Sequence, residues 1–96
     1  ALKAEAAAIT LQRLRQIIEG GLVDDAGGRR RFHFEAADGR ISFLNVSEII
    51  GLQLERGKVA IVQQPEDAEL HVLVTRDAAI KVTEVEPQLL RFLVRN

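Results

Sequence analysis

The chain has 96 residues, is 47% hydrophobic and carries a formal net charge of −1 at pH 7. This length and composition predict one folded domain with a modest core, while the slightly acidic balance disfavours a dedicated nucleic-acid-binding domain, which is usually basic. The absence of Cys excludes disulfides and thiolate metal sites. It also agrees with the cytoplasm, where we expect the protein to reside.

Targeting signals are missing from the sequence. No apolar run approaches the ~20 residues that span a bilayer, and the N-terminus lacks the layout of a signal peptide, so we expect no membrane association. Because the chain contains no Met, we interpret it as a fragment of a longer protein. We expect a single domain over residues 1–96, with an N-terminal helix over residues 1–20 and a sheet-and-helix core over residues 29–96.

The N-terminal helix is predicted from its Ala content and from apolar residues that recur at helical spacing. These residues are Ala7, Leu11, Leu14, Ile18 and Leu22. Gly20 and Gly21 follow as a break. Leu2 and Ile9 lie off the apolar stripe, so the first turns either fray, contact a partner, or continue a helix from upstream sequence.

The centre of the fold is predicted to be residues 31–62, as strand, turn, strand, helix and strand. Phe32 and Phe34 alternate with polar residues, which is typical of a strand with one buried face. Asp38-Gly39 predicts a hairpin, because this pair suits a type I′ turn. In the returning strand, residues 40–46, apolar side chains fall on both faces, so we expect either a bulge or a second covering layer.

Residues that can begin or end a helix set the limits of the remaining predicted helices and strands. Ser47 is predicted to cap a helix that Gly57 ends, and residues 58–62 form a short apolar run that we interpret as a central strand. A polar loop over residues 63–69 then leads to a strand over residues 70–74. Thr75 is predicted to cap the next helix, which Pro87 ends, and residues 90–94 form a closing strand.

The predicted order is therefore α-β-β-α-β-β-α-β. Two hairpins without a repeated βαβ unit favour an α+β fold with about three helices. We expect its five strands to form one mainly antiparallel sheet.

Three stretches resemble a known family: residues 40–47 (RISFLNVS), residues 56–62 (RGKVAIV) and residues 79–87 (AIKVTEVEP). They are similar in order and spacing to the C-terminal domain of the YaiL-like bacterial proteins, a family of unknown function labelled nucleoprotein or polynucleotide-associated enzyme. The resemblance covers residues 14–94. It implies a bacterial protein whose longer relatives carry a Lys-rich N-terminal segment.

The chain departs from the family pattern where that pattern tends to be basic or aromatic. Ser42 and Asn45 stand where the family tends to place Lys and an aromatic residue, and Thr83 and Val85 stand in place of two Arg. These departures remove positive charge that would support a polynucleotide role.

A cluster of Arg residues is the candidate nucleic-acid site: Arg29, Arg30, Arg31 and Arg40. Arg binds phosphate oxygens through two donors of its planar fork, so one interpretation is a phosphate clamp. The alternative is a solvated loop and hairpin edge paired with nearby carboxylates. Phe32 and Phe34 likewise have two interpretations, as base-stacking side chains or as core, and the core interpretation is favoured.

The sequence offers little catalytic chemistry. His33 and His71 would need a third ligand such as Glu35 or Glu69 to bind a metal, and nothing in their spacing requires it. The chain lacks a Cys nucleophile and a Gly-x-Ser-x-Gly elbow. We therefore expect no enzyme activity, no catalytic residues, no metal and no cofactor.

Strand edges and outward apolar residues suggest a different role. Leu73, Leu89 and Leu93 are expected to face outward and to form an interface, unless helices of the same domain cover them. We therefore predict a non-enzymatic protein-interaction or assembly module that contacts a protein partner or itself. The alternative is an accessory nucleic-acid-binding domain that uses the Arg cluster.

Overall fold

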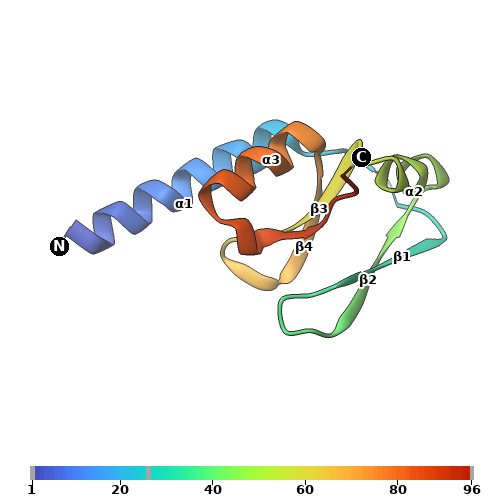
Figure 1. Cartoon of the computed structure of the whole chain (residues 1–96), viewed down its shortest axis with the longest axis horizontal. Coiled ribbons are helices and arrows are strands. Elements are labelled where there is room, and N and C mark those ends of the chain that lie inside the picture. Colours follow the sequence, from blue (N-terminus) through green and yellow to red (C-terminus); the bar gives the residue numbers. More distant parts are fainter. Residues whose placement is uncertain (1, 26, 96) are drawn as a thin grey trace.

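The computed structural model describes residues 2–25 and 27–95, with side chains from residue 8 onward, so the side chains of Leu2 and Ala7 in the predicted N-terminal helix lie outside this range. The predicted order of helices and strands is confirmed, with one added 3₁₀ turn, η1 (Figure 1). The elements are α1 (Leu2–Gly21), β1 (Arg30–Glu35), β2 (Ile41–Val46), α2 (Glu48–Glu55), β3 (Val59–Gln64), β4 (Asp67–Thr75), α3 (Arg76–Val85), η1 (Pro87–Leu89) and β5 (Leu90–Phe92).

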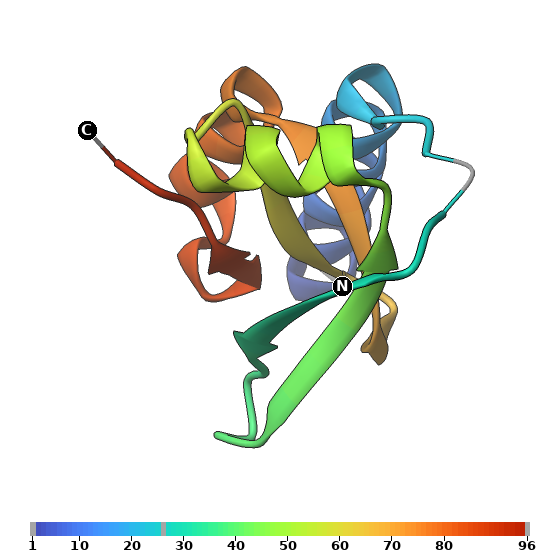
Figure 2. The same ribbon diagram turned by 90° about the vertical axis from the view of Figure 1, so that its right-hand side faces the viewer.

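The expectation of one five-stranded sheet is wrong. β1 and β2 form a two-stranded antiparallel hairpin, and the remaining strands form a separate three-stranded antiparallel sheet in the order β4-β3-β5. The hairpin crosses the face of that sheet instead of extending its edge (Figure 2). β1 meets β5 through side chains, with the rings of Phe32 and Phe92 in an edge-to-face contact at a centroid distance of 4.8 Å.

β3 is the centre of the molecule, as its apolar sequence predicts. Val59 and Ile61 face the hairpin and α2, and pack there with Phe34, Val46 and neighbouring residues. Ala60 and Val62 face the opposite way, into a second cluster formed with α1 and α3. Both faces of the strand are therefore covered, which explains its unbroken apolar run.

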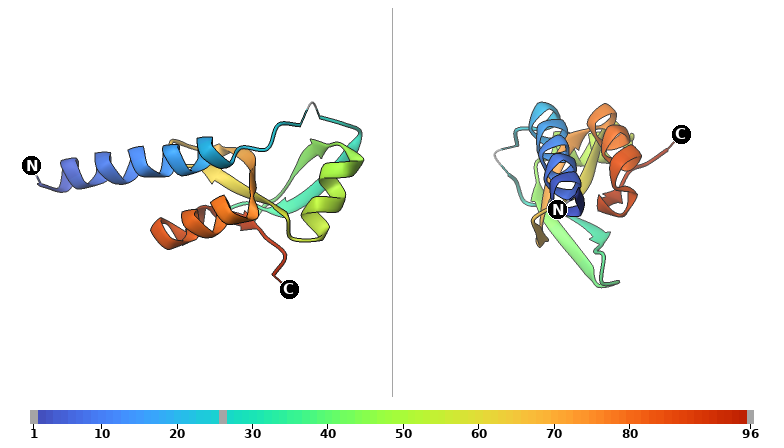
Figure 3. Two further views of the ribbon diagram at one scale, coloured as in Figure 1. Left: turned by 90° about the horizontal axis from the view of Figure 1, so that it is seen from above. Right: turned by 90° about the vertical axis from the view of Figure 1, so that its left-hand side faces the viewer.

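α1 and α3 cover one face of the three-stranded sheet, and they run side by side in opposite directions (Figure 3). Leu14 and Ile18 of α1 and Val82 of α3 are buried in this layer. The N-terminal part of α1 projects beyond the body, and the molecule measures 47 × 26 × 25 Å. Of the helices in the described part of the chain, none is long and apolar enough to cross a membrane.

The predicted helix caps are confirmed. The hydroxyl of Ser47 accepts the backbone N–H of Ile50, and that of Thr75 accepts the backbone N–H of Ala78. After α2, Gly57 takes a φ of +75°, which ends the helix as predicted.

The two turns differ from their predictions. Among the described residues only glycines have positive φ, so Asp38 is not in a type I′ turn. Instead the Gly39 N–H donates to the Ala36 carbonyl and the Ala36 N–H to that of Arg40, as in a three-residue hairpin loop. In the second hairpin β3 continues to Gln64, which pairs with Asp67. That loop is therefore shorter than the expected residues 63–69.

Candidate functional site on the open face of the hairpin

Of the strand pairs in the described structure, the β1–β2 hairpin has the most exposed apolar side chains, and these lie on its outer face. Pairing runs without a register shift from Arg30↔Val46 to Glu35↔Ile41, so side chains alternate strictly between two faces. The side chains on the outer face are all exposed: Arg31, His33, Glu35, Ile41, Phe43 and Asn45. We call this surface the open face.

The apolar side chains of residues 40–46 fall on both faces of their strand because one of these faces is the open face. Neither a bulge nor a second covering layer is present in the described part of the chain. Leu44 and Val46 face the core, while Ile41 is 69% exposed and Phe43 is 44% exposed. Both alternatives expected for this strand, a bulge and a second covering layer, are therefore wrong. The polar side chains that β1 places on this face were the available signal for its exposure.

Phe43 forms the middle of the open face. The guanidinium carbon of Arg31 lies 5.1 Å from the centroid of the Phe43 ring, within the range of a cation–π contact. The imidazole of His33, the cross-strand partner of Phe43, lies 5.8 Å away between centroids. An exposed aromatic ring is therefore held between two side chains of the neighbouring strand.

The other Phe residues belong to the core. Phe34 is buried, and Phe32 and Phe92 pack partly buried against the same cluster. The core interpretation of Phe32 and Phe34 is confirmed.

Charge changes sign along the open face. Arg31 lies at the end where β1 begins, and Glu35 lies at the end next to the turn. At the turn Asp38 and Arg40 approach each other, with a distance of 3.7 Å between Oδ2 and Nε. The face is thus basic at one end and mixed to acidic at the other.

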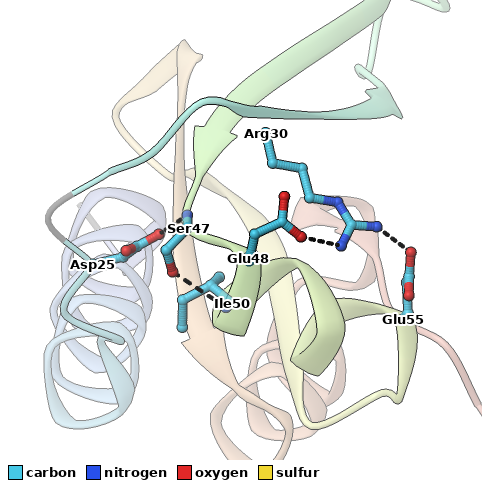
Figure 4. Close-up of polar contacts among 6 residues, drawn as sticks. All are labelled: Asp25, Arg30, Ser47, Glu48, Ile50 and Glu55. Carbon is cyan, nitrogen blue, oxygen red and sulfur yellow. Dashed lines mark hydrogen bonds and ion pairs between the residues drawn. The ribbon is translucent and has the colours of Figure 1, made fainter.

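Arg30 points to the opposite side of the hairpin, because alternate residues of a strand face opposite ways. Its guanidinium forms ion pairs with Glu48 and Glu55 at the two ends of α2 (Figure 4). The side chain passes over Gly51, where a Cβ atom would lie 2.7 Å from Arg30 Cδ. Arg30 therefore anchors α2 to β1.

The predicted Arg cluster does not converge on one surface. Arg31 lies on the open face, Arg30 beneath it against α2, and Arg40 at the turn. Arg29 is exposed in the segment before β1. In the same segment Asp25 accepts the backbone N–H of Ser47 at 3.1 Å, which ties the loop to the start of α2.

His33 and His71 lie on different surfaces. His71 is half-buried on β4, with its ring edge-on to Phe34 at a centroid distance of 4.7 Å. Burial lowers the pKa of His71; the nearby charge of Arg91 adds to this effect and the backbone of Glu69 partly opposes it. Its Nε2 atom is buried without a hydrogen-bond partner among the described residues, as is Oε1 of its cross-strand neighbour Gln63.

A cleft of about 440 Å³ lies between the hairpin turn and β4, and Ser42 and His71 are among its lining residues. His71 Nε2 has no hydrogen-bond partner among the described residues and is therefore not paired with Ser42. Among the described side chains, residues 8–25 and 27–95, no group of three His, Asp or Glu is placed to hold a metal ion. The cleft therefore presents no assembled acid–base pair or metal site.

The residues proposed from sequence as an interface are largely internal. Leu89 is only 6% exposed and belongs to the cluster beneath α1 and α3. Leu93 packs against that cluster, and Leu73 against the cluster beneath the hairpin. For Leu89 the expectation that it faces outward is wrong, and Leu73 and Leu93 are partly buried. The alternative left open from the sequence, cover by the same domain, therefore holds, with the hairpin as well as helices supplying the cover.

An exposed ion pair joins Arg15 of α1 to Glu66 in the turn between β3 and β4. The hydrogen bond to Glu66 raises the pKa of Arg15, and the same contact lowers the pKa of Glu66. This pair links α1 to the turn at the surface, where such an exposed pair contributes little to stability.

The comparisons with known proteins identify a family without a known activity. Neither the search of curated proteins nor the search of solved structures found a match. The sequence profile of one bacterial family matches residues 2–96, nearly the whole chain. The chain therefore belongs to the family described as "uncharacterized protein conserved in bacteria" (DUF2058).

Proposed function

We propose that this domain is a non-enzymatic protein-interaction module and that it binds its partner through the open face. The observation that carries the proposal is the exposure of Ile41 and Phe43, at 69% and 44%, on a regular strand surface. The inner face of the same hairpin is packed into the core. Contiguous exposed apolar side chains with a polar rim are typical of interaction sites.

The chemistry of the open face supports a protein partner. Aromatic and Arg side chains are enriched in protein interfaces, and here the central Phe43 stacks with Arg31 from one end of the face. The backbone beneath them is fixed by continuous strand pairing and by Phe34 and Val46, which are buried. A rigid surface loses little conformational entropy on binding, which favours affinity.

Site-specific photo-crosslinking tests this proposal in bacterial cells that make the protein. A photoreactive amino acid replaces Asn45, which lies on the open face, and in a control chain it replaces Glu84, which is exposed on α3. We expect discrete protein adducts from position 45 that are missing from position 84. Equal adducts from both positions, or none from position 45, would contradict the proposal.

Single-stranded nucleic acid is a second candidate ligand for the same surface. The observation in its favour is the Arg31–Phe43 pair, since bases stack on exposed aromatic rings beside basic side chains. The polynucleotide-associated label of the YaiL-like proteins, which the sequence resembles, points the same way. Glu35 at the other end of the face and the net charge of −1 count against it.

Fluorescent RNA and DNA binding at two salt concentrations separates the two candidates. Binding through phosphates weakens steeply as salt rises, and stacking requires the ring of Phe43. If nucleic acid is the ligand, Arg31→Ala and Phe43→Ala weaken binding, whereas the exposed Arg13→Ala on α1 does not. Absence of binding at low salt would eliminate this candidate.

A further inference from the structure

The charges on the open face would pair with the charges on a second, identical open face whose strands run in the opposite direction. Arg31 and Glu35 lie on the same side of β1, two positions before and two after His33. His33 pairs directly with Phe43, which marks the midpoint of the face. Opposite charges are therefore placed symmetrically about an aromatic centre.

This symmetry matters when two identical faces meet. One possible two-fold axis lies in the plane between the two faces, perpendicular to the strands, and passes over the His33–Phe43 pair. Rotation about this axis reverses the strand direction in the second copy. Arg31 then faces Glu35 of the second copy, and the same contact occurs again by symmetry. A two-fold axis along the strands instead places Arg31 over Asn45 and Glu35 over Ile41, which pairs no charges.

We propose that the partner of the open face is a second copy of this chain, docked face to face about the perpendicular two-fold axis. This inference rests on the proposed function and names its partner. About this axis Phe43 meets Phe43 of the second copy and supplies the apolar contact, Ile41 faces Asn45, and two Arg31–Glu35 contacts set the register. A phosphate backbone would meet Glu35 without compensation, so the charge pattern favours a second copy.

The expected dimer is weak. Each strand of the hairpin has six residues, and at about 3.3 Å per residue the face is about 20 Å long. Such a surface is smaller than the roughly 800 Å² per partner of a standard interface. We therefore expect a dissociation constant between about 0.1 and 1 mM, and self-association must be measured at high protein concentration.

Charge-reversed variants test the pairing by analytical ultracentrifugation up to about 1 mM. Arg31→Glu alone places like charges at both contacts, and Glu35→Arg alone does the same with the opposite sign. Each variant should remain monomeric by itself. Mixed in equal amounts they restore both opposite-charge contacts, so a heterodimer should form at least as readily as the wild-type dimer. Phe43→Ala should weaken wild-type association about tenfold.

A matched pair of variants controls for net charge. Arg13→Glu and Glu84→Arg carry the same charge changes on exposed sites of α1 and α3, across the three-stranded sheet from the hairpin. Each of these should dimerise as the wild type does, and their mixture should gain nothing further. Circular dichroism melts confirm that every variant is folded.

Two results would overturn the inference: a wild-type chain that stays monomeric at about 1 mM, or a dimer that Arg31→Glu leaves unchanged. The proposed function fails separately. If the chain is monomeric but position 45 still crosslinks to another protein, the open face binds a different partner. If both experiments are negative, the interaction function itself is rejected.

Discussion

Gly21 of α1 and Ala78 of α3 lie so close that a Cβ atom on the glycine would stand 2.2 Å from the Cβ of the alanine. Gly21→Ala should therefore push the two helices apart and lower the free energy of unfolding by about 1–3 kcal/mol. The neighbouring Gly20 has no atom within 4 Å of a built Cβ, so Gly20→Ala should be neutral or stabilising by up to about 1 kcal/mol. Urea denaturation of both variants measures the difference, and equal effects would disprove the close approach.

Gly57 and Gly39 both have positive φ, at +75° and +85°. A side chain at either position costs about 1–2 kcal/mol of backbone strain. At Gly57 a Cβ would also lie 2.3 Å from the carbonyl oxygen of Val94, whereas at Gly39 it would meet nothing within 4 Å. Gly57→Ala should therefore destabilise the fold more than Gly39→Ala. Comparable shifts in thermal melting would contradict this.

Arg30 and Arg29 are adjacent and chemically identical, yet their contributions to stability should differ. The side chain of Arg30 is 25% exposed and forms ion pairs with Glu48 and Glu55, while Arg29 is exposed. Because the two carboxylates are largely in solvent, each pair contributes little, and much of the effect comes from the packed stem. Arg30→Ala should cost about 1 kcal/mol and Arg29→Ala less than about 0.5 kcal/mol. Chemical denaturation compares them.

His71 should make stability depend on pH. Burial lowers its pKa in the folded state below the ordinary value of 6.5, so below that pH the unfolded chain binds a proton that the folded chain does not. The free energy of unfolding should fall as the pH drops through 6.5 and level off below the folded pKa. Denaturation at about pH 7.5 and about pH 5.5 should show a smaller loss for His71→Gln than for the wild type. The His33→Gln variant, in which His71 is intact, serves as the control.

Structural features that depend on only a few neighbouring residues were predicted correctly. Ser47 and Thr75 cap helices because their hydroxyl groups reach a backbone N–H three residues later, and this depends only on local geometry. The unbroken apolar run of β3 correctly identified a central strand, and the structure covers both of its faces. Asp38-Gly39 correctly marked a hairpin, although its turn type differs because Asp38 keeps a negative φ.

The candidate site was only partly predictable. Arg31 was identified from the sequence, but Phe43 was not. Alternation shows that Ile41 and Leu44 face opposite ways, but it does not show which face the rest of the chain covers. The same limit applies to Leu89, whose burial depends on α1 and α3 lying over η1.

The sequence by itself determined the order of helices and strands and the caps of α2 and α3, because caps, glycines and hydrophobic periodicity act over a few residues. Only the tertiary structure decided that the hairpin lies across the three-stranded sheet instead of extending it. That choice depends on Phe34 and Val46 packing onto Val59 and Ile61, which are distant in sequence. It buries one face of the hairpin and leaves the other open, so it also decided which of its side chains can bind a partner.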